Sequence, residues 1–313
     1  MSLDLSRERI LLTGGAGFLG SFVLEELVRS GARPEAIRVP RSATDDLREP
    51  AAARRCVEGC SVVIHLAANV GGIGYNREHP ADLAHDNLLM GIHVLDAARA
   101  AGVRKFVQVG TLCAYPKFTP VPFREEDLWN GYPEETNAPY GLAKKMLLVY
   151  GRALADQHGF PFIYLLPTNL YGPRDCFEWE RSHVIPALVR KCVEAVESGT
   201  QRIEAWGDGT PTREFLYVED AARAIVLATR LYEKTDPVNL GSGEEISILD
   251  LAGRIAAACG FRGELVWNPR QPNGQPRRRL DTTRAAQEFG FRAQVAIEAG
   301  IPRTVEWFRG HRG

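Results

Sequence analysis

The sequence lacks an excess of charge of either sign, and it lacks any long apolar run. Its 38 basic and 39 acidic residues give a formal net charge of −1, whereas a nucleic-acid-binding protein needs a clear basic surplus to replace the counterions of the phosphate backbone. No apolar run approaches the roughly 20 residues of a membrane span, and the segment Met1 to Arg9 contains no signal-peptide core. We therefore expect neither a nucleic-acid partner nor a membrane partner.

Cysteine is sparse and scattered along the chain. The six cysteines form no Cys-x-x-Cys pair and no compact framework. We therefore predict reduced thiols, a cytoplasmic protein and no metal site. The balanced net charge still permits an anionic small-molecule ligand, because a few local arginines are enough to bind one.

The 313 residues have a globular composition, with 45% hydrophobic and 25% charged residues. Predicted strands alternate with predicted helices in the first half of the chain. The strands are expected at 9–13, 36–41, 61–66, 105–109 and 162–166, and the helices at 18–30, 87–101 and 140–158. This alternation predicts an α/β fold, a Rossmann-type doubly wound parallel sheet with helices on both faces.

The second half is more irregular and suggests a smaller lobe. We expect residues 1–172 to form the Rossmann domain, together with a returning segment near 215–241 that adds a strand at 237–240. Residues 173–214 and 242–313 are expected to form the smaller C-terminal lobe. Asp220 is interpreted as the N-cap of a helix over 221–231, and His65 as a structural histidine whose hydrogen bonds are satisfied.

A glycine-rich turn follows the first predicted strand. The run Thr13-Gly-Gly-Ala-Gly-Phe-Leu-Gly20 places glycines at 14, 15, 17 and 20, with Ala16, Phe18 and Leu19 between them. Glycines let the backbone turn sharply and approach a pyrophosphate, which the free N–H groups of the following helix then bind. Because the turn lies between a strand and a helix, it predicts dinucleotide binding.

The residues after the second predicted strand indicate which dinucleotide is bound. NAD enzymes usually carry an acidic residue there for the ribose 2′-hydroxyl, but this chain reads Ile37-Arg-Val-Pro-Arg-Ser42. Arg41, or in its place Arg38, is suited to pair with a 2′-phosphate. NADP(H) is therefore favoured over NAD, and Asp46 and Leu47 are expected to border the adenine.

A tyrosine and a lysine stand four residues apart at the start of a predicted helix. In the run Tyr140-Gly-Leu-Ala-Lys144 both side chains lie on one helical face. A nearby ammonium is expected to lower the pKa of the phenol and make it a proton donor or acceptor near neutral pH. Thr111, after the strand at 105–109, is placed to hydrogen-bond the reacting oxygen, which predicts a Thr–Tyr–Lys catalytic set.

These motifs resemble the extended short-chain dehydrogenase/reductases. Within them the central part of the chain is similar to the GDP-L-fucose synthase family, the GDP-4-keto-6-deoxymannose 3,5-epimerase/4-reductases. The matching segments are Ala68–Ile73, Cys113–Lys117, Pro133–Tyr140, Pro167–Pro173, Ser182–Leu188 and Trp206–Phe215.

The resemblance implies specific roles at the site. Tyr140 would protonate the C4 carbonyl oxygen while NADPH delivers a hydride, and Lys144 would also contact the nicotinamide ribose. Cys113 and His183 would be the acid/base pair that inverts C3 and C5 before reduction. The further implied cofactor contacts are Ala67, Pro167, Asn169, Leu170 and His183. The implied substrate contacts are Asn169, Lys191, Trp206, Arg213, Asn273 and Arg277, and the implied homodimer forms through helices 87–101 and 140–158.

Several alternatives stay open from the sequence. Without the family, Cys113 would be taken as a small buried residue and His183 as a structural one. The chain also departs from the family, since Leu112 replaces a serine and Asn69 a lysine. The hypotheses are an NADPH-dependent 3,5-epimerase/4-reductase of a GDP-linked sugar, a nucleotide-sugar 4-reductase without epimerisation or an NAD-dependent epimerase, and a non-catalytic NADP-binding regulator.

Overall fold

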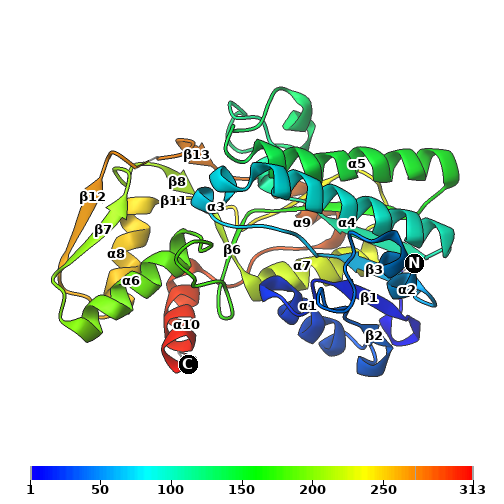
Figure 1. Cartoon of the computed structure of the whole chain (residues 1–313), viewed down its shortest axis with the longest axis horizontal. Helices are drawn as coiled ribbons and strands as arrows, with labels where there is room; N and C mark the ends of the chain where they lie inside the picture. The colour runs from blue at the N-terminus through cyan, green and yellow to red at the C-terminus, as the bar shows by residue number, and fades with distance from the viewer. Residues whose placement is uncertain (1, 272, 312–313) are drawn as a thin grey trace.

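The computed structural model describes residues 2–271 and 273–311, and these form a parallel sheet of six strands with a smaller lobe beside it (Figure 1). The strands are β1 (Ile10–Thr13), β2 (Ile37–Arg38), β3 (Val62–His65), β4 (Lys105–Val109), β5 (Phe162–Pro167) and β10 (Val238–Leu240). Their order in space is β10-β5-β4-β3-β1-β2, and neighbouring strands pair in parallel. The chain proceeds from β1 outward on both sides, and such a reversal opens a ligand-binding crevice at the carboxyl ends of the strands.

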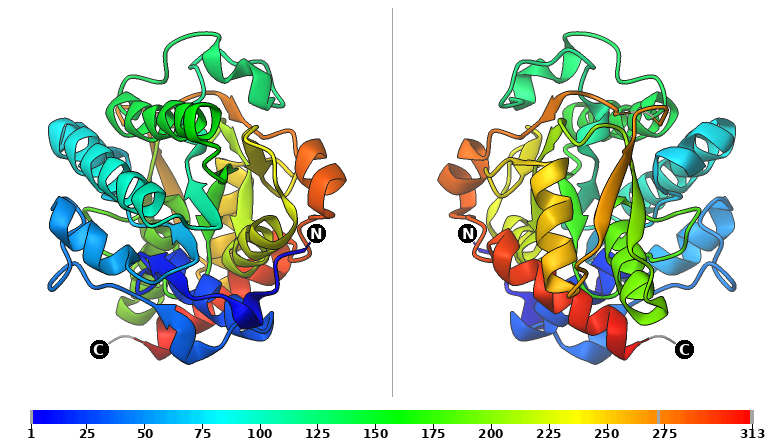
Figure 2. Two further views of the ribbon diagram at one scale, coloured as in Figure 1. Left: turned by 90° about the vertical axis from the view of Figure 1, so that its right-hand side faces the viewer. Right: turned by 90° about the vertical axis from the view of Figure 1, so that its left-hand side faces the viewer.

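Helices cover both faces of this sheet (Figure 2). On one face lie α1 (Phe18–Arg29), α7 (Val218–Leu231) and α9 (Thr283–Phe289); on the other lie α2 (Pro50–Val57), α4 (Pro80–Ala100) and α5 (Ala138–His158). Alternate residues of a strand point to opposite faces, so Leu12 and Leu11 of β1 belong to different buried clusters. The doubly wound Rossmann-type fold predicted from the sequence is confirmed.

Several element boundaries differ from the predicted ones. The strand expected at 36–41 is confined to Ile37–Arg38, because Pro40 has no N–H to donate to a neighbouring strand. The helix expected at 87–101 begins at Pro80, where proline suits the first helical turn. Helix α2 was not predicted, since its eight residues give too short a pattern. The short helix α3 (Ile73–Glu78) comes directly before α4.

The smaller lobe has its own core. Its helices are α6 (Val184–Ser198), α8 (Ile248–Ala258) and α10 (Ile297–Gly310). Its strands are β6 (Asn169–Tyr171), β7 (Arg202–Trp206), β8 (Thr212–Arg213), β9 (Phe215–Tyr217), β11 (Ile246–Ser247), β12 (Glu264–Asn268) and β13 (Arg277–Arg278). They pair as β12-β7, β11-β8-β13 and β6-β9. Side chains such as Val189, Ile255 and Ile301 form one buried cluster between these elements.

The chain returns to the large sheet twice. Strand β10 adds an edge strand beside β5 as expected. Residues 283–291, which the sequence assigned to the lobe, also pack against the sheet through Ala285, Phe289 and Phe291. Short 3-10 turns lie at Leu5–Arg7, Pro34–Ala36, Leu112–Ala114 and Glu125–Trp129. In the described part of the chain no helix is long and apolar enough to cross a membrane.

Asp220 does not cap a helix, so its predicted role is wrong. Helix α7 begins at Val218, which places Asp220 inside its first turn. The buried carboxylate accepts hydrogen bonds from the N–H groups of Gln294 and Val295, both at 2.8 Å, and from Arg223 at 2.6 Å. Asp220 therefore ties α7 to the segment that leads into α10.

Candidate active site

The glycine turn between β1 and α1 is packed too closely for side chains. A Cβ at Gly20 would lie 2.0 Å from the Gly14 carbonyl oxygen, and one at Gly14, where φ is +69°, would lie 2.8 Å from the Ala67 nitrogen. Gly17 caps α1 without a side-chain hydrogen bond. The first N–H groups of α1 are thus free to bind an anion.

A cavity of about 1060 Å³ opens above this turn. The residues with predicted cofactor roles that line it are Gly14, Ala16, Gly17, Phe18, Leu19, Gly20, Arg41, Asp46, Leu47, Ala67, Tyr140, Lys144, Pro167, Asn169, Leu170 and His183. Gly15 is placed differently, because its Cα faces the side chains of Val39 and Leu12. Its role is to let β1 and β2 pack closely at the start of the loop. A glycine cradle, a free helix N-terminus and a large cavity together fit a dinucleotide.

The two arginines considered for a 2′-phosphate are in different settings. Arg38 donates from Nη1 to the carbonyl oxygens of Arg55, Cys56 and Glu58, and so caps the end of α2. Arg41 is exposed on the loop and lines the cavity. Of the two arginines, Arg41 is therefore the one that lines the cavity, and its role toward a 2′-phosphate stays a prediction.

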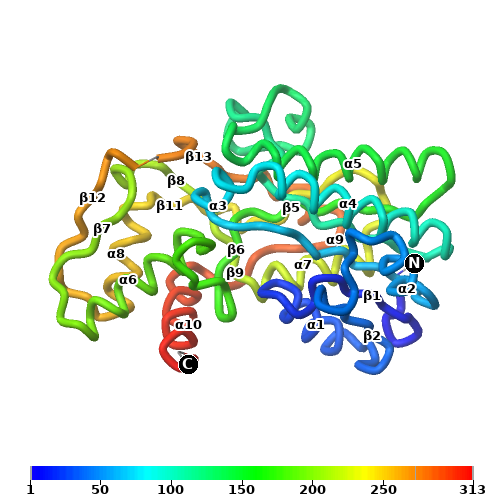
Figure 3. The backbone as a smooth tube through the Cα atoms, viewed as in Figure 1, coloured from blue at the N-terminus to red at the C-terminus, as the bar shows by residue number. Residues whose placement is uncertain are grey.

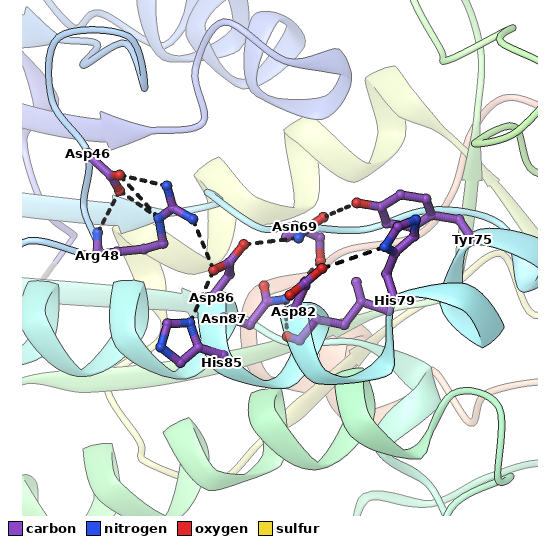
Figure 4. Close-up of polar contacts among 10 residues, drawn as sticks. Asp46, Arg48, Asn69, Tyr75, His79, Asp82, His85, Asp86 and Asn87 are labelled. Atoms are coloured by element: carbon purple, nitrogen blue, oxygen red, sulfur yellow. Dashed lines mark hydrogen bonds and ion pairs between the residues drawn. The ribbon is translucent and has the colours of Figure 1, made fainter.

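A polar network borders the same end of the cavity (Figure 4). Arg48 contacts Asp46 at 2.7 Å and Asp86 of α4 at 3.2 Å, and its hydrogen bonds lower the pKa of Asp46. Asp86 in turn accepts from Asn69 at 3.0 Å, and Asn69 accepts from Tyr75 of α3 at 3.2 Å. The network joins the loop after β2 to the segment after β3, so both walls of the cavity are held together.

Tyr140 and Lys144 lie at the start of α5, whose backbone path can be followed in Figure 3, beside the carboxyl end of β4. Their side chains are buried, and Lys144 Nζ donates to the Val109 carbonyl oxygen at 3.2 Å. The Thr111 hydroxyl hydrogen-bonds with Tyr140 and accepts from the Cys113 N–H at 3.2 Å. Helix α5 approaches this closely because Gly141 faces the Cys113 carbonyl oxygen, only 2.3 Å from where a Cβ would be. The structure thus brings the Thr–Tyr–Lys set together.

The pKa of Tyr140 moves opposite to the expected direction. Burial, followed by the nearby Cys113, raises the pKa of its phenol above the ordinary value, and the hydrogen bond with Thr111 opposes this rise. Burial also lowers the pKa of Lys144 to about 8. The expectation that the ammonium lowers the phenol pKa is therefore wrong for the protein alone, because desolvation dominates at such a buried site.

Only one of the two ring nitrogens of His65, at the end of β3, has a hydrogen-bond partner among the described residues. Its Nδ1 lies 2.8 Å from the Thr13 hydroxyl oxygen, but Nε2 has no partner among the described residues. Burial, with a smaller contribution from Lys144, lowers the pKa of its imidazole to about 3. The low pKa keeps the imidazole neutral, and the prediction that its hydrogen bonds are satisfied is wrong, because Nε2 has no partner in the part of the chain that the structure describes.

A second cavity, of about 470 Å³, lies between the sheet and the lobe. The residues with predicted substrate roles that line it are Asn169, Lys191, Trp206, Arg213 and Asn273. Cys113 and His183 line both cavities. His183 directly precedes α6, and burial lowers the pKa of its imidazole. A thiol and an imidazole thus flank the junction where a bound cofactor and a bound substrate would meet.

Two arginines line the second cavity together with Lys191. Arg213 and Arg278 line it, and burial together with the charge of Arg278 lowers the pKa of Arg213 to about 10. Arg277, the predicted substrate contact, instead lies on the other side of β13 and binds Glu245 at 2.5 Å. Successive strand residues point to opposite faces, so the adjacent Arg278 occupies the place that was predicted for Arg277.

Some lining residues carried no sequence signal. Trp179 and Trp267 line the second cavity beside Trp206, and Asp175 lines the first. Trp267 belongs to β12, which pairs with the β7 strand of Trp206. That pairing joins segments about 60 residues apart, so no local pattern could have revealed it. For Arg278, the sequence offered one signal: in a strand over 277–279, successive side chains point to opposite faces, so Arg277 and Arg278 cannot both face the cavity.

Comparison with known proteins agrees with this geometry. Residues 10–241 match the NAD dependent epimerase/dehydratase family. The chain is 38% identical to a GDP-L-fucose synthase of Sinorhizobium fredii over 97% of its own length and 96% of the relative, and 35% identical to that of Escherichia coli over 97% of each. A crystal structure of a GDP-L-fucose synthetase from Naegleria fowleri bound to NADP superimposes with a TM-score of 0.88 at 32% identity, covering 99% of this chain and 95% of the other.

The fold, the glycine turn and the Thr–Tyr–Lys set define a dinucleotide-dependent enzyme of the short-chain dehydrogenase/reductase type. The chain belongs to the NAD dependent epimerase/dehydratase family, on a match that covers most of its length. Within that family its similarity extends over nearly the full chain to the GDP-L-fucose synthases.

Proposed function

We propose that the protein is an NADPH-dependent 3,5-epimerase/4-reductase of a GDP-linked 4-keto-6-deoxy sugar. The observation that carries this proposal is the junction of the two cavities. There Cys113 and His183, suited to epimerisation, line both cavities, and Tyr140 and Lys144, suited to reduction, line the cofactor cavity. Similarity to GDP-L-fucose synthases over nearly the whole chain supports the same activity.

Bound NADPH would supply a hydride at C4 of the sugar. Gly14, Gly17 and the N-terminus of α1, which line the cofactor cavity, would hold its pyrophosphate, and Arg41 would hold its 2′-phosphate. Tyr140 would donate the proton that the C4 oxygen needs, with Thr111 hydrogen-bonded beside it. Lys144 is fixed to the Val109 carbonyl oxygen, so its charge stays close to the phenol that gives up the proton.

Epimerisation beside a ketone needs two groups that exchange protons on opposite faces of the sugar. A thiol and an imidazole both change protonation near neutral pH. Cys113 follows β4 and His183 precedes α6, so the two come from the large sheet and the lobe. Arg213 and Arg278 would bind the diphosphate of the substrate, since paired guanidiniums suit phosphate oxygens.

The test combines three measurements on one reaction. NADPH oxidation at 340 nm is followed with GDP-4-keto-6-deoxymannose, NADH is tried in parallel, and the sugar product is identified by NMR in deuterated water. We expect turnover with NADPH and deuterium at C3 and C5. Cys113→Ser should suppress deuterium incorporation. Reduction without deuterium at either carbon would refute epimerisation and leave a 4-reductase, whereas no NADPH consumption would refute the reductase.

We also propose a homodimer formed through α4 and α5. These helices lie side by side on one face of the sheet (Figure 2). Helix α5 exposes Met146 and Val149, three residues apart on one helical face. Two copies of each helix would cover these apolar side chains, and light scattering of the purified protein would detect the doubled mass or, in a monomer, its absence.

Because all six cysteines carry thiols, we further propose a cytoplasmic location, which cell fractionation checks.

A further inference from the structure

Asp175 is a buried carboxyl group in the wall of the cofactor cavity. The residue is 9% exposed and lines the same cavity as Gly17, Phe18 and Leu19. Oδ1 accepts a hydrogen bond from the Cys176 N–H at 2.7 Å. Oδ2 is buried and has no hydrogen-bond partner among the described residues. A buried polar atom without a partner costs free energy, so its persistence points to a ligand that supplies one.

The backbone beside Asp175 is held in a strained conformation. Arg174 has a φ of 67°, a positive value that no other non-glycine residue shows within 2–271 and 273–311, and such strain gathers at functional sites. Its guanidinium donates to Ser21 at 3.1 Å and to Glu25 at 2.6 Å, and stacks on the Phe22 ring. These three residues belong to α1. Arg174 thus anchors the segment to the helix whose N-terminus would bind the pyrophosphate, and this anchor holds Asp175 at that end of the cavity.

The surroundings of Asp175 favour its neutral form. Burial raises the pKa of its carboxyl to about 7, while the hydrogen bond from Cys176 opposes that rise. The titratable and charged groups that line the cavity from other elements are Arg41, Asp45, Asp46 and Arg48 after β2, Asp86 of α4, Cys113 after β4, Tyr140 and Lys144 of α5, and His183 before α6. Cys176, Glu178 and Arg181 share the segment of Asp175. The charge of Arg174 is already paired with Glu25 of α1.

We propose that Asp175 is a cofactor-binding residue that acts as a neutral acid, its Oδ2–H donating a hydrogen bond to a diphosphate oxygen of the bound dinucleotide. Diphosphate oxygens only accept hydrogen bonds, and an ionised carboxylate beside them would repel them. Binding therefore takes up a proton whenever the free protein carries Asp175 ionised. This inference rests on the cofactor site proposed above.

The test measures NADPH binding rather than turnover. Dissociation constants are determined by calorimetry between pH 7 and 9, where the 2′-phosphate, with a pKa of about 6, is already ionised. Proton uptake is obtained from buffers of different ionisation enthalpy. Wild-type Kd should rise by up to about tenfold per pH unit above 7 from this one group. Asp175→Asn keeps an N–H donor, so it should bind well across this range, and its proton uptake should be smaller by as much as one proton.

Controls separate Asp175 from the other titrating groups. Lys144, whose pKa burial lowers to about 8, also titrates in this window. It is present in wild type and variant alike, so the difference between the two curves isolates Asp175. Glu180→Gln removes an exposed carboxylate from the same segment and should reproduce the wild-type curve. Asp175→Ser gives a second, smaller donor if Asp175→Asn folds poorly.

Two results would overturn the inference. One is equal pH dependence and equal proton uptake in wild type, Asp175→Asn and Asp175→Ser. The other is loss of binding in both variants at every pH, which would mean that the ionised carboxylate accepts a hydrogen bond from the cofactor. If the wild-type protein itself failed to bind NADPH at any pH, the proposed cofactor site would fall, a result distinct from either of these.

Discussion

The two cavities meet at Cys113 and His183, but different parts of the structure form their walls. The cofactor cavity contains a backbone cradle, in which a glycine turn and a helix N-terminus lie at the carboxyl ends of parallel strands. The substrate cavity is formed mainly by side chains from α6 and from three short strand pairings. A backbone site is rigid and shared by every member of a fold, whereas a side-chain site changes with each substitution. The difference explains why one region identifies the cofactor and the other must identify the sugar.

The largest expected effect lies at the boundary between the two regions. Tyr140→Phe removes the proton donor to the C4 oxygen but keeps the ring, so 4-reduction should fall by about 10²–10⁴-fold while NADPH binding is retained. Tyr150→Phe is the matched control, because Tyr150 lies on the same helix and its hydroxyl contacts Asp96 of α4. Reduction rates and NADPH titrations of the two variants make the comparison. A Tyr140→Phe enzyme within tenfold of wild type would remove this residue from the mechanism.

A smaller effect sharpens the description of the substrate cavity. Arg278→Ala should raise the KM for the nucleotide sugar about tenfold, since hydrogen bonds to a charged group contribute about 1.5–3 kcal/mol, and leave the Kd of NADPH unchanged. Arg277→Ala removes a neighbouring guanidinium that binds Glu245 at the surface, and its KM should stay near wild type. Steady-state kinetics separate the two. If both substitutions raised the KM equally, the positive charge of residues 277–279 as a whole would attract the substrate, rather than a direct contact with Arg278.

The smallest effect contrasts backbone packing in the two regions. A Cβ at Gly20 would collide with the Gly14 carbonyl oxygen, so Gly20→Ala should lower the free energy of unfolding by about 1–3 kcal/mol and weaken NADPH binding. Gly253 lies exposed in α8 of the lobe with open space around it. Gly253→Ala should instead stabilise the protein by about 0.5–1 kcal/mol. Chemical denaturation measures both, and a tolerated Gly20→Ala would contradict the picture of a rigid cradle.

The predictions made from the sequence succeeded where the interactions are local. Tyr140 and Lys144 share a helical face because of their spacing, and Gly14 to Gly20 form one turn, so the amino-acid order is enough to place both. The predicted N-cap role of Asp220 was wrong because the hydrogen-bond partners of its carboxylate, Gln294 and Val295, lie more than 70 residues away along the chain. The prediction that the hydrogen bonds of His65 are satisfied failed as well, because the partners of a buried ring nitrogen depend on which distant segments pack around it.

By itself, the sequence determined the parallel sheet, from the alternation of strands and helices, and the positions of the glycine turn and of the Tyr140–Lys144 pair, from spacing within one segment. Cys113 and His183 became candidates only through the family resemblance. The tertiary structure alone decided that Arg278 rather than Arg277 lines the substrate cavity and that desolvation raises the Tyr140 pKa. It also decided that Asp175 Oδ2, in the wall of the cofactor cavity, has no hydrogen-bond partner among the described residues. Each of these depends on burial or on contacts between distant segments. Burial and the fields of neighbouring groups exist only once the chain has folded, so no local pattern records them.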